Sequence, residues 1–149
     1  MQVPAINIAP FLLGKPEGKQ KVVTAVANAC RDIGFLVISG HGLPDADLER
    51  AFSLTRGFFE LPQKEKDRWH PTGPSKQRGY HAFETRGLAH TLDSKVPLDL
   101  RETVFLGPID DQRAHYQNLK EAQPAYWPNT IPTQPGGVDG AVVNIYRGF

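Results

Sequence analysis

The sequence has little of what builds secreted, nucleic-acid-binding or membrane proteins. Its 149 residues include one cysteine, Cys30, which excludes an intramolecular disulfide and a zinc cluster made of cysteines. The 17 basic and 16 acidic side chains give a formal charge of +1, so no field of one sign attracts nucleic acid or anionic lipid. Residues 1–10 contain prolines and no lysine or arginine, unlike a signal peptide or spanning helix. We therefore expect a cytoplasmic protein with no nucleic-acid or membrane partner.

Hydrophobic patterns in the first third of the chain predict a strand, a helix and a second strand. Two isoleucines alternate between prolines, which indicates a short strand within residues 4–10. Apolar residues spaced by three and four predict an amphipathic helix over about 18–34, with Cys30 on its buried face. The apolar run 35–38 predicts a central strand that is buried on both faces. The stripe of the predicted helix consists of Val22, Val26, Ala29 and Ile33.

The rest of the chain adds helices and strands, which together predict a mixed α/β fold. A helix is expected to begin near Pro44, and residues 63–69 to form one or two further turns with a solvated charged face. Strands are predicted at 79–83 and 102–106, with their pairing left open. A proline-rich surface connection, 124–137, precedes a last helix. The predicted buried stripes are Leu48, Phe52, Thr55 and Phe59 in the earlier helix, and Val142, Ile145, Tyr146 and Phe149 in the last.

The sequence contains no complete motif for a metal site. A mononuclear iron that activates oxygen takes two histidines and a carboxylate, commonly starting with His-x-Asp or His-x-Glu, and neither tripeptide occurs here. His81 precedes Glu84 by three residues, and His90 precedes Asp93 by three. One hypothesis is a small metal-dependent enzyme built from these pairs. The alternative is that the histidines lie on the surface or in the core, since a strand at His81 would separate it from Glu84.

The segment Gly40-His41-Gly42 allows two interpretations. Glycines between a strand and a helix are where phosphate-binding loops lie. Asp45 stands where that pattern requires a third glycine, and its carboxylate would repel a pyrophosphate. We therefore interpret the segment as a tight turn, in which the His41 side chain bonds to backbone and has no catalytic role. The residues around Ser39 do not form the motif of a catalytic nucleophile.

Several short patterns follow one another over residues 4–128. They are Pro4-x-Ile6-x-Ile8, Gly34-Phe35-Leu36-Val37-Ile38, Gly40-His41-Gly42-Leu43, Phe58-Phe59-x-Leu61-Pro62 with Lys64-Glu65-Lys66, Arg78-Gly79-Tyr80, Asp99-x-Arg101-Glu102-x-x-Phe105 and Trp127-Pro128. In this order and with this spacing, the chain resembles the N-terminal region of the isopenicillin N synthase-like, non-haem Fe(II)- and 2-oxoglutarate-dependent dioxygenases. Tyr126 departs from the asparagine often found before Trp-Pro in that family, which leaves subfamily and substrate open.

The resemblance implies a fold for this chain and places the cofactor-binding residues in later sequence. Residues 1–128 would form the dioxygenase N-terminal domain, whose helices and strands pack on a double-stranded β-helix, or jelly-roll, core that is largely missing from this chain. Residues 129–149 would connect to that core and begin a truncated helix. Fe(II) would be bound by a later His-x-Asp and a distant histidine, and 2-oxoglutarate by a later Arg-x-Ser. This chain alone would bind neither cofactor and would be inactive, while the complete enzyme would oxidise a small molecule.

The resemblance also places candidate substrate-binding residues at Arg78 and Tyr80. Arginine offers a carboxylate two parallel donors and tyrosine a third, so this pair suits a substrate that carries a carboxylate. The alternative is that Arg78 is a solvated loop residue and that Tyr80 packs in the core. A second hypothesis for the whole chain is a free-standing, non-catalytic interaction module, derived from such an enzyme, that docks a partner through the apolar face of its last helix.

Overall fold

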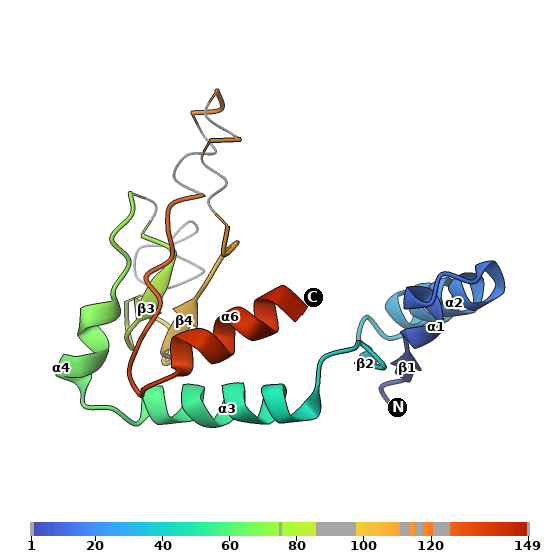
Figure 1. Cartoon of the computed structure of the whole chain (residues 1–149), viewed down its shortest axis with the longest axis horizontal. Coiled ribbons are helices and arrows are strands. Elements are labelled where there is room, and N and C mark those ends of the chain that lie inside the picture. Colours follow the sequence, from blue (N-terminus) through green and yellow to red (C-terminus); the bar gives the residue numbers. More distant parts are fainter. Residues whose placement is uncertain are drawn as a thin grey trace. The chain divides into compact units, whose positions relative to one another are not determined.

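The structure, a computed structural model, describes residues 2–74, 76–85, 98–110, 114–115, 118–120 and 126–148 (Figure 1). It has the mixed α/β fold that the sequence predicts, with two small sheets among the described residues. The helices and strands are β1 (Ala5–Asn7), α1 (Ala9–Leu12), α2 (Pro16–Asp32), β2 (Val37–Ser39), α3 (Asp45–Phe59), α4 (Gln63–Lys66), the 3-10 helix η1 (Asp67–Trp69), β3 (Gly79–His81), β4 (Thr103–Phe105) and α6 (Val138–Gly148).

The chain divides into two compact units, residues 1–48 with 148–149 and residues 49–147. Within the described part of the chain, no helix is long and apolar enough to cross a membrane. In the first unit, β1 and β2 form a parallel two-stranded sheet, with Ile6 opposite Ile38. Helix α2 covers this sheet, and three residues of its predicted stripe, Val22, Val26 and Ala29, are confirmed. The core consists of Ile6, Val22 and Ala29, against which Ile8, Ala25, Val26 and Leu36 pack. Ile33, the fourth residue of the predicted stripe, follows the end of α2.

Two predictions for the first unit are wrong. Residues 37–39 do form a strand, but Val37 is 55% exposed, so β2 is not a central strand buried on both faces. The reason is that β2 has one neighbour, β1, in its two-stranded sheet, and burial of both faces needs a packed layer on each. Cys30 is exposed rather than buried, because it lies one position beyond Ala29, which enters the core together with Val22.

The Gly40-His41-Gly42 segment is the tight turn that the sequence predicts. Both glycines have positive φ, 66° and 87°, a conformation that glycine adopts without strain. The backbone N–H of Leu43 donates to His41 Nδ1 at 3.2 Å, so the histidine does bond to backbone. A side chain at Gly40 would overlap Asn7, whose Oδ1 accepts the N–H of Ala9 at 2.9 Å.

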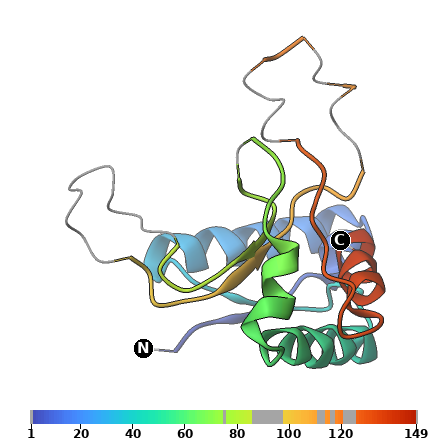
Figure 2. The ribbon, with the colours of Figure 1, turned by 90° about the vertical axis from the view of Figure 1, so that its left-hand side faces the viewer.

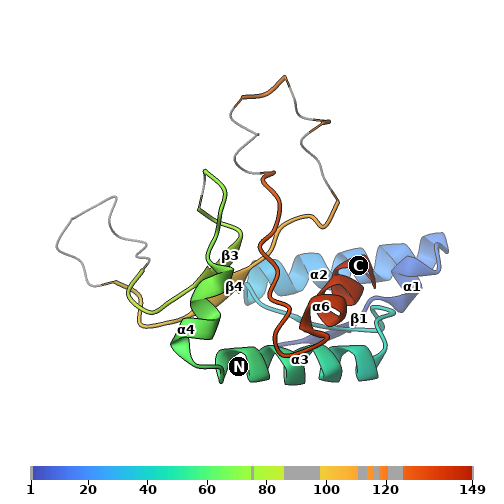
Figure 3. The same ribbon diagram turned by 60° about the vertical axis from the view of Figure 1, so that its left-hand side comes forward.

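In the second unit, β3 and β4 pair antiparallel, which answers the question that the sequence left open. Tyr80 stands opposite Val104 in this register. The short helix α4 lies beside the β3–β4 pair, as the views in Figures 2 and 3 agree. Residues 63–69 form α4 and η1, as predicted, but their charged face is not wholly solvated, because Lys66 is buried.

The buried face of α3 differs from the predicted stripe. Phe58 is 1% exposed and is the residue of α3 that enters the core, whereas Phe52 is 74% exposed. Helix α6 buries Val138 and Ala141 rather than the predicted positions. Of that predicted stripe, Tyr146 is 43% exposed; Val142 and Ile145 are half-buried, and Phe149 lies outside the described residues.

Candidate functional site

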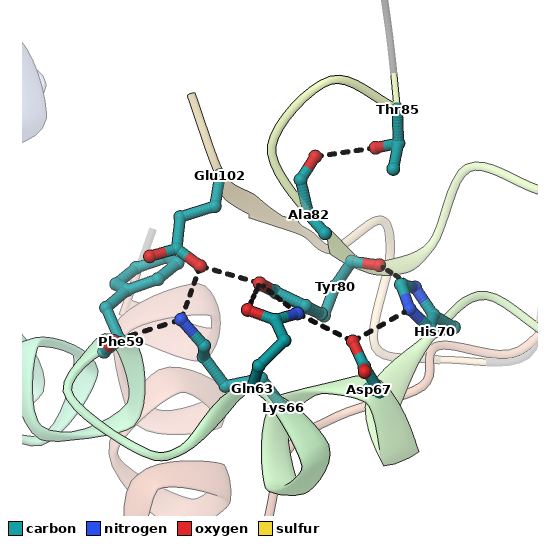
Figure 4. A network of polar contacts seen from close by, with 9 residues as sticks. All are labelled: Phe59, Gln63, Lys66, Asp67, His70, Tyr80, Ala82, Thr85 and Glu102. Atoms are coloured by element: carbon teal, nitrogen blue, oxygen red, sulfur yellow. Dashed lines mark hydrogen bonds and ion pairs between the residues drawn. The ribbon is translucent and has the colours of Figure 1, made fainter. Parts of the chain in front are cut away.

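Tyr80 lies in the core of the second unit, with none of its surface exposed. Its ring packs edge-on against Phe58, with 5.6 Å between the ring centroids. Its hydroxyl donates to Glu102 Oε2 at 2.6 Å and accepts from Gln63 Nε2 at 3.1 Å (Figure 4). These contacts join β3 to β4 and to α4. Glu102 directly precedes β4, and Gln63 opens α4.

A second buried polar group, the ammonium of Lys66, completes this cluster. Lys66 Nζ donates to Glu102 Oε2 at 2.7 Å and to the carbonyl of Phe59 at 3.2 Å (Figure 4). The second bond satisfies a carbonyl in the last turn of α3, where a cation is favoured by the negative end of the helix dipole. Because the side chains of Lys66 and Glu102 are 7% and 16% exposed, this ion pair is shielded from solvent. We call Gln63, Lys66, Tyr80 and Glu102 the buried polar cluster.

Folding lowers the pKa of Glu102 and raises the pKa values of Lys66 and Tyr80. For Glu102, burial raises the pKa of the carboxyl, but the hydrogen bonds from Lys66 and Tyr80 and the charge of Lys66 outweigh it, so that pKa lies below its ordinary 4.5. For Lys66, burial lowers the pKa of the ammonium, but contacts with Glu102 and Tyr80 hold it above 10.5. Burial, then the hydrogen bond to Glu102, raises the pKa of Tyr80. The cluster is therefore a neutral phenol bonded to an ion pair.

The imidazole of His70 holds the backbone of Tyr80 in place. Its Nδ1 lies 2.9 Å from the carbonyl oxygen of Tyr80, and its Nε2 lies 3.2 Å from Asp67 Oδ1 (Figure 4). The His70 ring also stacks, tilted, on the Tyr80 ring at 5.4 Å between centroids. The residues at the end of η1 thus hold β3 in place, which in turn sets the position of the residue before it, Arg78.

Arg78 lines a cavity of about 240 Å³ in the second unit. Its side chain is half-buried, and its guanidinium lies over the ring of Tyr126, 5.9 Å from the centroid, which is within range of a cation–π contact. Tyr80, in the core, is not among the residues that line this cavity. We call this space the Arg78 cavity; its lining residues are Arg78, Pro108, Ile109, Asp110, Tyr126, Trp127, Pro128, Asn129 and Ile131.

Glycine 79 explains why the two predicted site residues separate. In a regular strand, side chains two positions apart point to the same face, which would bring Arg78 and Tyr80 together. Gly79 has a φ of 154°, a conformation that side-chain-bearing residues rarely adopt. A side chain there would also lie 2.6 Å from the carbonyl oxygen of Trp69. The backbone bends at Arg78, directly before β3 begins at Gly79, so Arg78 stands outside the strand and lines the cavity, while Tyr80 enters the core.

The histidine–carboxylate pairs do not form a metal site in the part of the chain that the structure describes. His81 is buried, with its Nε2 2.8 Å from the carbonyl oxygen of Gln77. Glu84 is exposed and lies beyond the end of β3. His90 and Asp93 lie outside the described residues. Among the described residues, no group of three or more histidine, cysteine, aspartate or glutamate side chains could hold a metal ion.

Comparison with known proteins gives one consistent result. Residues 3–134 match the family model of the non-haem dioxygenase in morphine synthesis N-terminal domain. A proline hydroxylase of Petromyces alliaceus is 31% identical over 113 residues, 75% of this chain and 35% of the relative. A homoarginine-6-hydroxylase of Oryza sativa subsp. japonica is 36% identical over 151 residues, 95% of this chain and 43% of the relative.

A solved structure has the same fold over nearly the whole chain. The full-length Neurospora crassa protein in complex with alpha-KG and thymine superposes with a TM-score of 0.67 at 23% identity, covering 98% of this chain and 43% of that one. The chain thus spans well under half the length of these relatives, and its match is to their N-terminal part.

Proposed function

Because the chain belongs to the N-terminal domain family of the non-haem, 2-oxoglutarate-dependent dioxygenases, we propose that it forms the first, substrate-facing part of such an oxygenase. The complete protein would hydroxylate a small organic molecule, or oxidise it in a related way. Several relatives carry names of this kind, among them a 2-oxoglutarate-dependent dioxygenase of Didymella fabae that is 35% identical over 131 residues. Residues 1–128 would be the N-terminal domain, and residues 129–149 the connection to a catalytic domain.

Fe(II) does not fit the residues that the structure describes, since these offer no group of metal-ligating side chains. We therefore assign no iron ligand to the described residues, and we propose, as the resemblance implies, that Fe(II) and 2-oxoglutarate bind to sequence outside this chain. The role left to the chain is to shape the pocket for the organic substrate.

The observation that carries this proposal is the position of Arg78. It places a guanidinium in the wall of a cavity whose other lining residues are mostly apolar or aromatic, the composition of a small-molecule site. A guanidinium binds a carboxylate through two parallel N–H donors, so the proposed substrate carries a carboxylate. Tyr80 would contribute indirectly, because its buried contacts hold β3 and with it Arg78.

Two experiments test the proposal. The coding sequence downstream of Phe149 should contain His-x-Asp or His-x-Glu, and a long reading frame without either tripeptide would overturn it. Calorimetric titration of the chain itself with Fe(II) should give no saturable heat. Saturable binding of Fe(II) by this chain would mean that the assignment of the iron site to other sequence is wrong.

The alternative function is a non-catalytic interaction module that docks a partner through the apolar face of its last helix, where Tyr146 is 43% exposed. Exposed apolar residues of the first unit offer a second surface for association. Phe35 and Val37 are 73% and 55% exposed, and large exposed apolar patches mark association sites. Sedimentation velocity discriminates between the two functions. A self-associating chain whose association is abolished by Val37→Lys would favour the module, whereas a monomer at all concentrations would count against it.

A further inference from the structure

We infer that Gly107 and Asn129 are positioning residues that seat the guanidinium of Arg78 in the wall of the Arg78 cavity. This inference rests on the proposed role of Arg78 in substrate binding. It concerns how that side chain is held, which decides how well it can recognise a planar anionic group.

Gly107 provides the space in which the guanidinium lies. A Cβ atom built on Gly107 would overlap the Arg78 guanidinium, at 2.6 Å from Nε, which is closer than real Cβ contacts. The guanidinium therefore lies directly against the backbone of Gly107, while its Cζ is 5.9 Å from the centroid of the Tyr126 ring. Any larger residue at position 107 must displace the end of the arginine side chain.

Asn129 fixes that backbone. Its Oδ1 accepts the N–H of Gly107 at 2.8 Å, and its Nδ2 donates to the carbonyls of Gly107 and Pro108 at 3.2 Å and 3.0 Å. Both backbone polar groups of Gly107 are thus bonded to one side chain. Since Asn129 and Pro108 both line the cavity, this amide joins its two walls and holds the surface on which Arg78 lies.

A seated guanidinium has an energetic consequence for binding. An arginine side chain that moves freely in solution must lose rotamer entropy when it binds a ligand, whereas one held in place has already lost it. The backbone carbonyl of Arg78 also accepts the N–H of Thr130 at 3.4 Å, so both ends of the residue are tied to the segment that carries Asn129. Substitutions at 107 and 129 should therefore weaken anion binding although neither side chain donates to the anion.

The test follows the Arg78 guanidinium directly. In the whole chain labelled with ¹⁵N, the Nε–H signal of Arg78 is assigned by its loss in Arg78→Lys. The Tyr126 ring should shift it away from the signals of solvated arginines, and Gly107→Ala should return it towards them. Stability should change little, because the displaced atoms are the end of a flexible side chain. The matched control is Gly136→Ala, where an added Cβ meets nothing within 4 Å, and it should leave the signal in place.

Asn129→Ala supplies a second, independent variant. It should shift the same Nε–H signal of Arg78. The double variant with Gly107→Ala should shift that signal little further, because both substitutions disturb the same surface against which the guanidinium packs. An Arg78 signal that stays unchanged in folded Gly107→Ala and in folded Asn129→Ala would overturn the inference.

A benzoate titration separates this inference from the proposed function. Benzoate should shift the Arg78 signal saturably in the natural chain, and Gly107→Ala should weaken that binding roughly tenfold, as the loss of one charge-assisted hydrogen bond does. If benzoate binds equally well to both, the positioning role is wrong. If Gly107→Ala shifts the Arg78 signal but benzoate does not bind even the natural chain, the positioning role is supported and the assignment of a carboxylate-bearing substrate is wrong.

Discussion

Lys66 Nζ and Tyr80 Oη both donate to the same oxygen, Oε2 of Glu102, at 2.7 Å and 2.6 Å. One carboxylate oxygen therefore joins α4, β3 and the start of β4. Tyr80, a member of the buried polar cluster, lies in β3, and β3 positions Arg78. The proposed substrate-binding role of Arg78 therefore depends on an intact cluster.

Removing the cation from this cluster should destabilise the protein strongly. Lys66→Met leaves the Glu102 carboxylate buried beside a neutral phenol, and breaking a buried pair in this way costs about 3 kcal/mol of unfolding free energy. The control is Arg68→Ala, which breaks a solvated pair with Glu65 at 2.7 Å, where Arg68 is 62% exposed, and should cost below about 0.5 kcal/mol. Urea denaturation followed by circular dichroism measures both. Equal losses of unfolding free energy in the two variants would show that the buried Lys66–Glu102 pair stabilises the protein no more than the solvated Arg68–Glu65 pair.

The cluster should also make stability depend on pH at both ends of the scale. The pKa of Glu102 is lowered by folding, so its contribution is present above the ordinary 4.5 and is lost as pH falls through the lower folded value. The pKa of Lys66 is raised, so its contribution is complete below 10.5 and is lost as pH rises through the higher folded value. The pKa of Tyr80 is also raised, so its contribution is complete below 10.0 and is lost as pH rises through the higher folded value. Between 4.5 and 10.0, the stability contributed by the cluster should therefore be constant.

Glu102→Gln isolates the acid limb of that profile. The variant keeps the shape of the side chain but removes its charge, so it should be less stable than the natural protein at pH 7. The difference in unfolding free energy should shrink as pH falls below 4.5, where the carboxyl of the unfolded natural chain is protonated. A difference that stays constant from pH 7 to pH 3 would contradict the lowered pKa.

Backbone conformation at the Gly40-His41-Gly42 turn gives a third prediction. Gly40→Ala places a methyl group against Asn7 and 3.0 Å from Ala9 Cβ, at a φ of 66°. It should cost about 2 kcal/mol or more, the sum of strain and overlap. Gly42→Ala is the matched control, because its φ is 87° but nothing lies within 4 Å of the added Cβ. It should cost only about 1 kcal/mol. Thermal melts that rank the two variants in the opposite order would refute this account of the turn.

The sequence predicted the features that depend on neighbours along the chain. Helix α2 and the turn at His41 follow from local spacing and from glycine, and the structure contains both. The predictions that failed depended on distant contacts. Lys66 stands in a charged run and was expected to be solvated, yet its partner Glu102 lies 36 residues away along the chain, and no local pattern indicates that pair. The central-strand prediction for residues 35–38 failed similarly, since strand burial depends on what packs against it.

The candidate site residues came from the resemblance, not from a local pattern. Arg78 and Tyr80 were predicted together because the resemblance places substrate-binding groups in this segment, and because a guanidinium and a phenol suit a carboxylate. The glycine between them was visible in the sequence, but its φ of 154° was not. Their roles in substrate binding stay predictions. Gly107 and Asn129, the seat of Arg78, had no signal in the sequence, because a glycine and an asparagine in loops are ordinary there.

The corrected face of α3 provides the last prediction. Phe58 is 1% exposed and packs edge-on against Phe59 and Tyr80, at 5.4 Å and 5.6 Å between centroids. Phe58→Ala should therefore lower the unfolding free energy by about 3–4 kcal/mol, the cost of a large cavity in a core. Phe52, on the same helix, is 74% exposed, and Phe52→Ala should cost less than about 1 kcal/mol. Chemical denaturation of both variants decides between the observed face and the stripe expected from the sequence. If Phe52→Ala proved the more damaging, the stripe through Leu48 and Phe52 would be the buried one after all.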